Sequence, residues 1–201
     1  MSRVVSENFE QQKGMLLDAA VEAFATDGFT RASMSRIAQR AGVSKALIYH
    51  YFPGKEHLLY AAMLRYLLTL KSALASTGAR ADRSLDATLR RLLDRYHATQ
   101  HDHTVLMAEL RHLPAELRGP VVGLQRDVLA FMRQAIAQAA PAIRAEDLGA
   151  VTMLVMGMVN WLHTWYREDG PVAQDRLAEL VLRTVGGALQ GVVRSREGAS
   201  A

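Results

Sequence analysis

The segment from Ser33 to Leu59 constrains the fold most, because its apolar residues predict two short helices separated by a tight turn. Before the turn, apolar side chains recur at helical spacing, at Met34, Ile37, Ala38 and Ala41. After the turn comes Ser44, a residue type that caps helix N-termini, followed by a second apolar face at Leu47, Ile48, Tyr51 and Phe52. Gly42 lies in the turn, where a steep angle between two helices needs a backbone conformation that glycine reaches easily. The segment therefore predicts a helix-turn-helix.

The charge of this segment favours contact with nucleic acid. Between Arg31 and Lys55 there is no Asp or Glu, and the basic residues are Arg31, Arg36, Arg40, Lys45 and Lys55. Such a local positive surface attracts phosphate oxygens, and the second helix of the motif can enter a DNA major groove. For Arg36 and Arg40, the solvated face of an amphipathic helix is an equally good explanation.

The run GFTRASMSRIAQRAGVSKALIYHYFPGKEHLL resembles the N-terminal DNA-binding domain of the TetR family of bacterial transcriptional repressors. The resemblance covers residues 10 to 60, and it implies that Lys45 and Ala46 face base edges with Leu47 beside them. It also implies phosphate contacts from hydroxyl, aromatic and basic residues, namely Ser33, Ser44, Tyr49, His50 and Lys55. Many relatives carry Gly at the position of Ala46, and Ser or Asn at the position of Gly54. Tyr51 and Phe52 are expected in the core.

The composition is that of an ordinary globular protein. The chain has 201 residues, 50% of them apolar, and a net charge of +4. Without cysteine it can form neither disulfides nor thiolate sites. The longest apolar stretch, residues 150–159, is too short to span a bilayer, and the N-terminus lacks the apolar core of a signal peptide. We therefore expect a cytoplasmic protein with no membrane partner.

Helical periodicity continues through the rest of the chain and predicts an all-α fold of about nine helices. A first helix with an apolar face from Leu16 to Phe24 is expected to end at Asp27–Gly28, and a long helix begins at Lys55. Further helices are predicted at 82–101, 103–112, 115–139, 146–167 and 173–194. The TetR resemblance implies two domains. Residues 1–55 would form a three-helix helix-turn-helix domain, and residues 56–201 a helical bundle that binds a ligand and dimerises.

The segment NWLHTWY, from Asn160 to Tyr166, is the second informative motif. Trp161 and Trp165 are one helical turn apart, so both rings share a face. The segment resembles TetR-family members that respond to acyl-CoA thioesters, which implies a ligand pocket. The predicted ligand contacts are Met107, Arg111, Met156, Asn160, Trp161 and Trp165. Two tryptophans that fill a helix-helix or dimer interface explain the same motif equally well, and the methionines suit an ordinary core. Arg111 could equally pair with Glu109 or Glu116.

These features predict a homodimeric transcriptional repressor that binds a pseudo-palindromic operator and is released by a small-molecule effector. The effector would be an acyl-CoA or another hydrophobic compound. Residues 148–166 and 172–193 are expected to form the dimer interface, where Gly157, Gly186 and Gly187 permit close approach. Three alternatives stay open: a regulator of drug efflux that senses a hydrophobic or cationic compound, a DNA-binding protein without a ligand, and a ligand-binding module or enzyme that keeps the motif as a relic.

Enzymatic and metal-binding functions find little support in the sequence. It contains no Gly-rich phosphate loop, nucleophile elbow or His-Glu-x-x-His motif, so we expect no catalytic residues and no cofactor. His97 and His101 are one helical turn apart, with His103 and His112 nearby, but no carboxylate completes a zinc-binding set on their face. We therefore expect no metal site.

Overall fold

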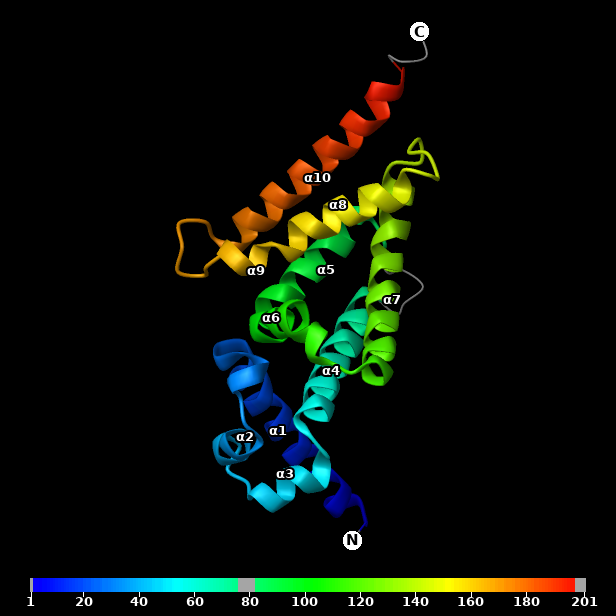
Figure 1. Cartoon of the computed structure of the whole chain (residues 1–201). Coiled ribbons are helices and arrows are strands. Elements are labelled where there is room, and N and C mark those ends of the chain that lie inside the picture. The colour runs from blue at the N-terminus through cyan, green and yellow to red at the C-terminus, as the bar shows by residue number, and fades with distance from the viewer. Residues whose placement is uncertain (1, 76–81, 198–201) are drawn as a thin grey trace. The chain divides into compact units, whose positions relative to one another are not determined.

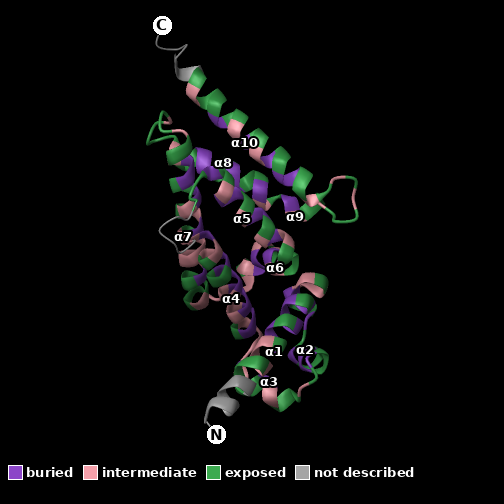
Figure 2. Ribbon diagram, turned by 180° about the vertical axis from the view of Figure 1, so that it is seen from behind, coloured by how far each residue is buried: buried purple, intermediate pink, exposed green. Residues whose placement is uncertain are grey.

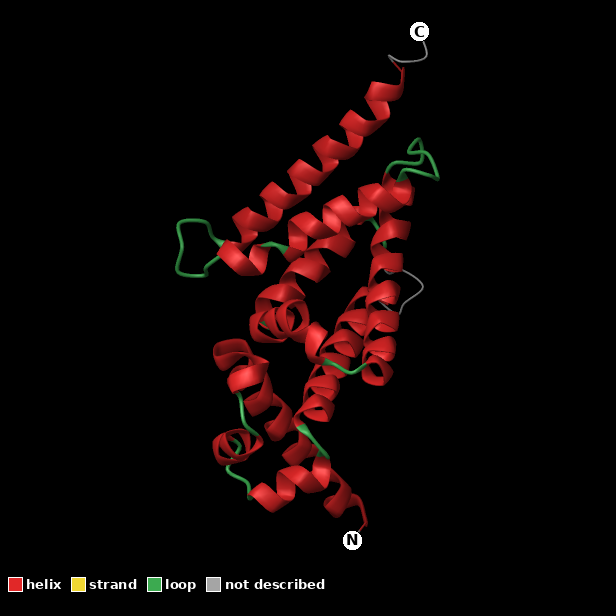
Figure 3. Ribbon diagram, in the orientation of Figure 1, coloured by secondary structure: helices red, strands yellow, loops and turns green. Residues whose placement is uncertain are grey.

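All regular secondary structure in the described part of the chain is helical. The computed structural model describes residues 2–75 and 82–197, which contain ten α-helices, one 3-10 helix and no strand (Figure 3). This confirms the predicted all-α fold with an N-terminal helix-turn-helix. Packing divides the chain into two units. One comprises Met1–Thr69 and Thr99–Leu124, and the other Leu70–Ala98 and Gln125–Ala201.

This division differs from the predicted boundary between residues 55 and 56, because the first part of α4 (Lys55–Ala75) and all of α6 (Gln100–Glu109) belong with the helix-turn-helix. Within this unit α6 packs extensively against α1 (Ser2–Arg31). The boundary at residue 55 remains a prediction about domains that can fold separately.

The helix-turn-helix consists of α2 (Met34–Arg40) and α3 (Lys45–Tyr51), each seven residues long. The predicted caps are in place: the Ser33 hydroxyl accepts from the Arg36 amide at 3.3 Å, and the Ser44 hydroxyl from the Leu47 amide at 3.1 Å. Gly42 has a φ of 68°, the positive value that the turn was expected to need. In Figure 1, α3 leads into the start of α4.

Helices α2 and α3 are too short to be stable alone, so they gain their stability from the surrounding core. Ile37 of α2 and Ile48 of α3 are fully buried, as are Leu16 of α1 and Leu58 of α4. Each such side chain contributes about 1.5–3 kcal/mol by leaving water. The 3-10 helix η1 (Leu110–His112) follows α6, and the first ten residues of α7 (Ala115–Ala139) complete this unit.

The second unit is built from the ends of α4 and α7 together with α5 (Leu85–Ala98), α8 (Leu148–Asn160), α9 (Leu162–Trp165) and α10 (Gln174–Glu197). Its fully buried residues include Leu89, Leu92, Ile136, Val159 and Val185, and Figure 2 shows buried positions along α8 and α10. Helices were predicted to run unbroken over 103–112 and 146–167. The structure instead changes to a 3-10 turn at Leu110 and breaks at Trp161.

Among the described helices, α4 is the one whose length and composition would allow it to cross a membrane. Its apolar residues Leu58, Met63 and Leu67 are buried within the protein, as in the core helix of a globular fold. Arg65 and Lys71 of the same helix form ion pairs with Asp18 and Asp127 at 2.7 and 2.6 Å. The burial and the ion pairs identify α4 as a core helix.

Gly28 ends the regular part of α1, as predicted, with φ 76° and ψ 157°. This combination is accessible almost only to glycine, so we expect Gly28→Ala to lower the free energy of unfolding by about 1–3 kcal/mol. Gly42→Ala meets only the milder cost of a positive φ, about 1–2 kcal/mol, because its added methyl finds open space. Denaturant titration would measure both changes. Gly14→Ala, within α1 and also in open space, is the control and should stabilise the protein. A smaller loss for Gly28→Ala than for Gly42→Ala would contradict this ranking of the two glycines.

Candidate nucleic-acid interface

The exposed face of α3 carries the residues that were predicted to contact DNA. Lys45, Ala46, Tyr49 and His50 are exposed, and Leu47 is partly exposed, whereas Ile48 is buried on the opposite face. Tyr49 is 46% exposed, which is unusual for a large aromatic side chain in a folded protein. A cation, a methyl group, a phenol and an imidazole therefore lie on one accessible helical surface. These groups suit base edges and phosphates.

The two capping serines lie at the N-termini of α2 and α3, and both are exposed. Each hydroxyl oxygen accepts a backbone amide, which leaves its O–H proton available as a donor. A phosphate oxygen could accept that proton and also meet the unpaired amides of a helix N-terminus. The structure thus makes Ser33 and Ser44 accessible donors, and their contact with phosphate stays a prediction.

The arginines of α2 point partly toward acids on α1. Arg36 lies 3.7 Å from Asp27, and Arg40 lies 3.6 Å from Glu22. Both arginines are exposed, so these ion pairs contribute little to stability. The segment from Arg31 to Lys55 contains no acid, but acidic residues of α1 therefore neutralise part of its positive charge. This agrees with the alternative that Arg36 and Arg40 form a solvated helix face.

Tyr51 and Phe52 differ in burial, although both were expected in the core. Phe52 is only 4% exposed, but Tyr51 is partly exposed at the end of α3. The Tyr51 hydroxyl donates to Gln12 Oε1 at 2.9 Å, and its ring lies 4.6 Å from that of Phe9. Tyr51 therefore joins the recognition helix to the first turns of α1.

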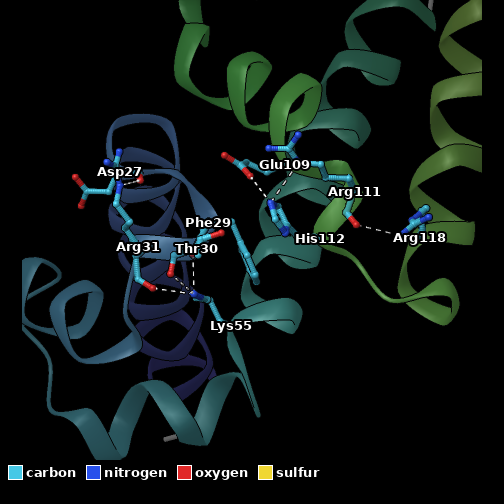
Figure 4. A network of polar contacts seen from close by, with 10 residues as sticks. Asp27, Phe29, Thr30, Arg31, Lys55, Glu109, Arg111, His112 and Arg118 are labelled. Atoms are coloured by element: carbon cyan, nitrogen blue, oxygen red, sulfur yellow. Dashed lines mark hydrogen bonds and ion pairs between the residues drawn. The ribbon is translucent and has the colours of Figure 1, made fainter.

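Lys55 is engaged within the protein. Its Nζ donates to the carbonyl oxygens of Phe29, Thr30 and Ala32 at 2.7, 3.3 and 2.9 Å (Figure 4). It also lies 4.3 Å from the centroid of the Phe29 ring. An ammonium group has three protons, and each has an acceptor here. Nζ is thus directed to the protein's own carbonyl groups here, and the phosphate contact of Lys55 stays a prediction.

A second polar cluster connects η1 to the end of α1 (Figure 4). The His112 ring stacks on Phe29 at 4.9 Å, and its Nε2 lies 3.2 Å from the buried carboxylate of Glu109. Arg118 of α7 donates to the carbonyl oxygens of Arg111 and Leu113, which holds η1 in place. Sequence analysis named Glu109 as a possible partner of Arg111, but it did not predict the contact between His112 and Phe29, which are far apart in the chain. The only local signal was the break before Pro114.

The six predicted ligand contacts are divided between the two units. Met107 and Arg111 belong to the first unit, where Arg111 Nε lies 3.4 Å from His112 Nε2, and no ion pair of Arg111 with Glu109 or Glu116 is found among the described residues. The other four belong to the second unit. Trp161 and Trp165 are 64% and 53% exposed, which favours the interface alternative for these rings over a closed pocket.

Asn160 and Met156 are placed in the interior of the second unit. Met156 is buried, and Asn160 Oδ1 accepts from the Tyr96 hydroxyl at 2.6 Å. Burial raises the pKa of Tyr96 well above its ordinary value, so the hydroxyl keeps its proton and donates. On the next residue of α5, His97 Nδ1 is buried without a hydrogen-bond partner in the described part of the chain. Polar groups of this kind are expected where a ligand binds.

Each unit contains an open cavity within its described residues, and neither cavity contains a predicted ligand contact. The first, about 660 Å³, lies between α1 and the start of α4, and Tyr51, His57, Tyr60, Leu64 and Leu68 are among its lining residues. The second, about 580 Å³, is lined by residues that include Leu85, Pro141, Gly186 and Leu189.

Two of the histidines that were considered as metal ligands contact other side chains. His97 Nε2 lies 3.1 Å from Glu168, and the buried His103 Nδ1 lies 3.1 Å from the Tyr66 hydroxyl. Over the described residues, no group of three or more His, Asp and Glu side chains is arranged to hold a metal ion.

Substitution of Ser44 can separate its capping role from its proposed phosphate contact. Ser44→Ala should cost about 1 kcal/mol of stability and weaken binding to double-stranded DNA. Ser44→Asp should keep the cap and therefore the stability, but weaken DNA binding at least as much, because the carboxylate repels phosphate. Thermal unfolding and a DNA-binding isotherm would measure the two effects. DNA binding by Ser44→Asp that equals the wild type would contradict the placement of this serine at the DNA.

Family models match both parts of the chain. Residues 16–62 match the model described as bacterial regulatory proteins, tetR family, and residues 78–189 match the tetracyclin repressor-like C-terminal domain. The HTH-type transcriptional regulator BetI 1 of Chromohalobacter salexigens is 33% identical over 110 residues. That alignment covers 54% of this chain and 54% of BetI 1, so the chain spans about half the length of this relative.

Solved structures are similar over most of the chain. A TetR-family regulator from Bordetella parapertussis has 27% identity and a TM-score of 0.74, and the alignment covers 86% of this chain and 93% of that one. AibR in complex with isovaleryl coenzyme A and operator DNA has 22% identity and a TM-score of 0.71, with 87% and 96% covered. The second likeness shows the shared fold. Members of the matching family are transcriptional regulators and not enzymes. With its capped helix-turn-helix, its exposed recognition helix and family matches over both parts of its length, this chain belongs to the TetR family of bacterial transcriptional regulators.

Proposed function

We propose that this protein is a ligand-responsive repressor that binds a pseudo-palindromic operator as a homodimer. The observation that carries the proposal is the exposed face of α3, where Lys45, Ala46, Tyr49 and His50 are accessible together. Lys45 and Ala46 would read base edges, with Leu47 beside them, and Ser33, Ser44, Tyr49 and His50 would hold phosphates. The operator lies in the cytoplasm of a bacterium, so the proposal includes a cytoplasmic location.

A homodimer is supported by an apolar surface on α8 and α10. On α8 the side chains of Met153, Leu154 and Met158 are exposed, followed by Trp161, although the opposite face of the helix is already buried in the core. On α10 the exposed large apolar side chains are Leu180 and Val192, and Gly187 and Gly191 lie on the same face as Leu180. An apolar surface of this extent is typical of an interface. A second copy of this chain would cover it and bring two recognition helices to one operator.

The effector proposed first is an acyl-CoA thioester. The resemblance of residues 160–166 to acyl-CoA-responsive family members supports it, as does the fold shared with AibR, whose complex contains isovaleryl coenzyme A. Asn160, the Tyr96 hydroxyl and the unsatisfied nitrogen of His97 supply polar groups inside an apolar unit. They suit the carbonyl of a largely apolar ligand. A drug-efflux regulator that senses a hydrophobic or cationic compound is the second candidate.

Leu154 tests the proposed dimer interface, because it is 74% exposed on α8. We expect the wild type to be a dimer at micromolar concentration and Leu154→Glu to be a folded monomer, since a buried unpaired carboxylate is strongly unfavourable. Sedimentation would distinguish the two states. Leu68→Glu, at an exposed leucine of α4, is the matched control and should remain dimeric. A Leu154→Glu variant that sediments as the wild-type dimer would rule out this interface.

Calorimetry with fatty acyl-CoA, phenylacetyl-CoA, isovaleryl-CoA and free CoA tests the effector. At least one thioester should bind at about micromolar affinity or tighter and reduce operator binding, because it prefers the conformation that does not fit DNA. The operator can first be obtained by sequencing the genomic fragments that the protein retains. Asn160→Leu should weaken thioester binding about tenfold. Gln138→Leu, at an exposed amide of α7, should not. If a planar cationic compound binds and no thioester does, the drug-efflux candidate takes its place.

A further inference from the structure

The end of α1 leaves backbone carbonyl groups that need partners. The helix departs from helical geometry at Gly28, and the last carbonyls of a helix have no amide within the helix to bond. The amide of Ala32 bonds the carbonyl of Gly28 at 3.1 Å, but the carbonyls of Phe29, Thr30 and Ala32 converge on one point. That point is occupied by Nζ of Lys55.

In the chain, Lys55 and its three acceptors lie on opposite sides of the helix-turn-helix. The three carbonyl groups lie just before Ser33, the cap that begins α2. Lys55 itself begins α4, three residues after Phe52, the C-cap of α3. One ammonium group therefore joins the two chain ends of the helix-turn-helix. The loops on both sides of α2 and α3 are held at a fixed separation by these hydrogen bonds.

The same site also reaches η1. Figure 4 shows the Phe29 ring between Lys55 and His112. The ammonium lies 4.3 Å from the ring centroid, which is a favourable cation-π distance, and the His112 ring stacks at 4.9 Å. Glu109 pairs with His112, and Arg118 fixes the carbonyls of η1, so the stack is supported from α6 and α7.

From this geometry we propose that Lys55 is a positioning residue that sets the orientation of the recognition helix, and that it does not serve as a phosphate ligand. The proposal rests on the proposed DNA-binding function and adds a residue that acts through α2 and α3 rather than on DNA. A positioning residue and a phosphate ligand predict different salt dependence, because each phosphate contact contributes about 0.9 to the slope of log affinity against log salt.

Three variants of the full-length protein separate the two roles. Lys55→Met removes the charge and keeps the length of the side chain, and Lys55→Arg keeps the charge but replaces the compact ammonium with a planar guanidinium. Lys45→Met removes a charge from the exposed start of α3 and is the matched control. The probe is a genomic fragment selected by the wild type, with a random fragment of equal length beside it.

For Lys55→Met we expect operator affinity to fall about tenfold or more with an unchanged salt slope, because charged hydrogen bonds that orient the helix are lost. Lys55→Arg should lose affinity as well, since a planar group fits three converging carbonyls poorly. Hydrogen exchange of the amides at residues 32–37, measured without DNA, should accelerate in both Lys55 variants. In Lys45→Met these amides should exchange at the wild-type rate, while the preferred DNA sequence changes.

A salt slope that decreases by about 0.9 in Lys55→Met, with wild-type exchange at residues 32–37, would overturn the proposal in favour of a phosphate contact. Wild-type operator affinity in Lys55→Arg would overturn it too, because arginine replaces lysine readily at a phosphate. If Lys55→Met does not fold, Lys55→Arg and its exchange rates decide. A wild type that binds no genomic fragment better than random DNA would refute the repressor function. The exchange measurement would still test whether the hydrogen bonds of Lys55 hold the segment before α2.

Discussion

The recognition helix is only seven residues long, and this constraint governs the first unit. A helix of two turns has no stability of its own in water, so its orientation must come from the residues around it. Burial of Ile48 holds one face of α3 against the core, which leaves the opposite face with Lys45 and Tyr49 accessible. The Ser44 cap fixes where the helix begins, and Tyr51 joins its last turn to α1. The orientation of α3 therefore depends on packing that lies outside its exposed face.

The polar contacts around Phe29 extend this dependence beyond the helix-turn-helix. Lys55 approaches the ring within the α1–α4 junction, and His112 approaches it from η1. Because α6 and η1 pack with the helix-turn-helix in one unit, a displacement of η1 would also move the residues just before α2. In the proposed regulation, an effector would shift the population between a conformation that fits DNA and one that does not, and only by its difference in affinity for the two. Such regulation requires a ligand that discriminates between them, and not merely one that binds.

Local signals in the sequence were sufficient for the helix-turn-helix and insufficient for its supports. The spacing of Ile37 and Ile48, the serine caps and the glycine turn act over a few residues, and all were predicted. The hydrogen bonds of Lys55 to the end of α1 were not, because its acceptors lie 23 to 26 residues earlier in the chain. Periodicity placed Trp161 and Trp165 on one face but did not determine whether that face is inside or outside. The breaks at Leu110 and Trp161 were missed because no glycine or proline marks them.

Hydroxyl-radical footprinting of the full-length protein on a selected genomic fragment tests most directly whether two recognition helices read one operator. If two copies of α3 do so, the protein should protect two patches related by a two-fold axis, with centres about one helical turn, roughly 10 base pairs, apart or a multiple of it. The patches should fade as salt is raised, since phosphate contacts release counterions. A single uninterrupted protected region, or protection equal to that of a random fragment, would contradict a dimeric repressor that reads DNA through α3.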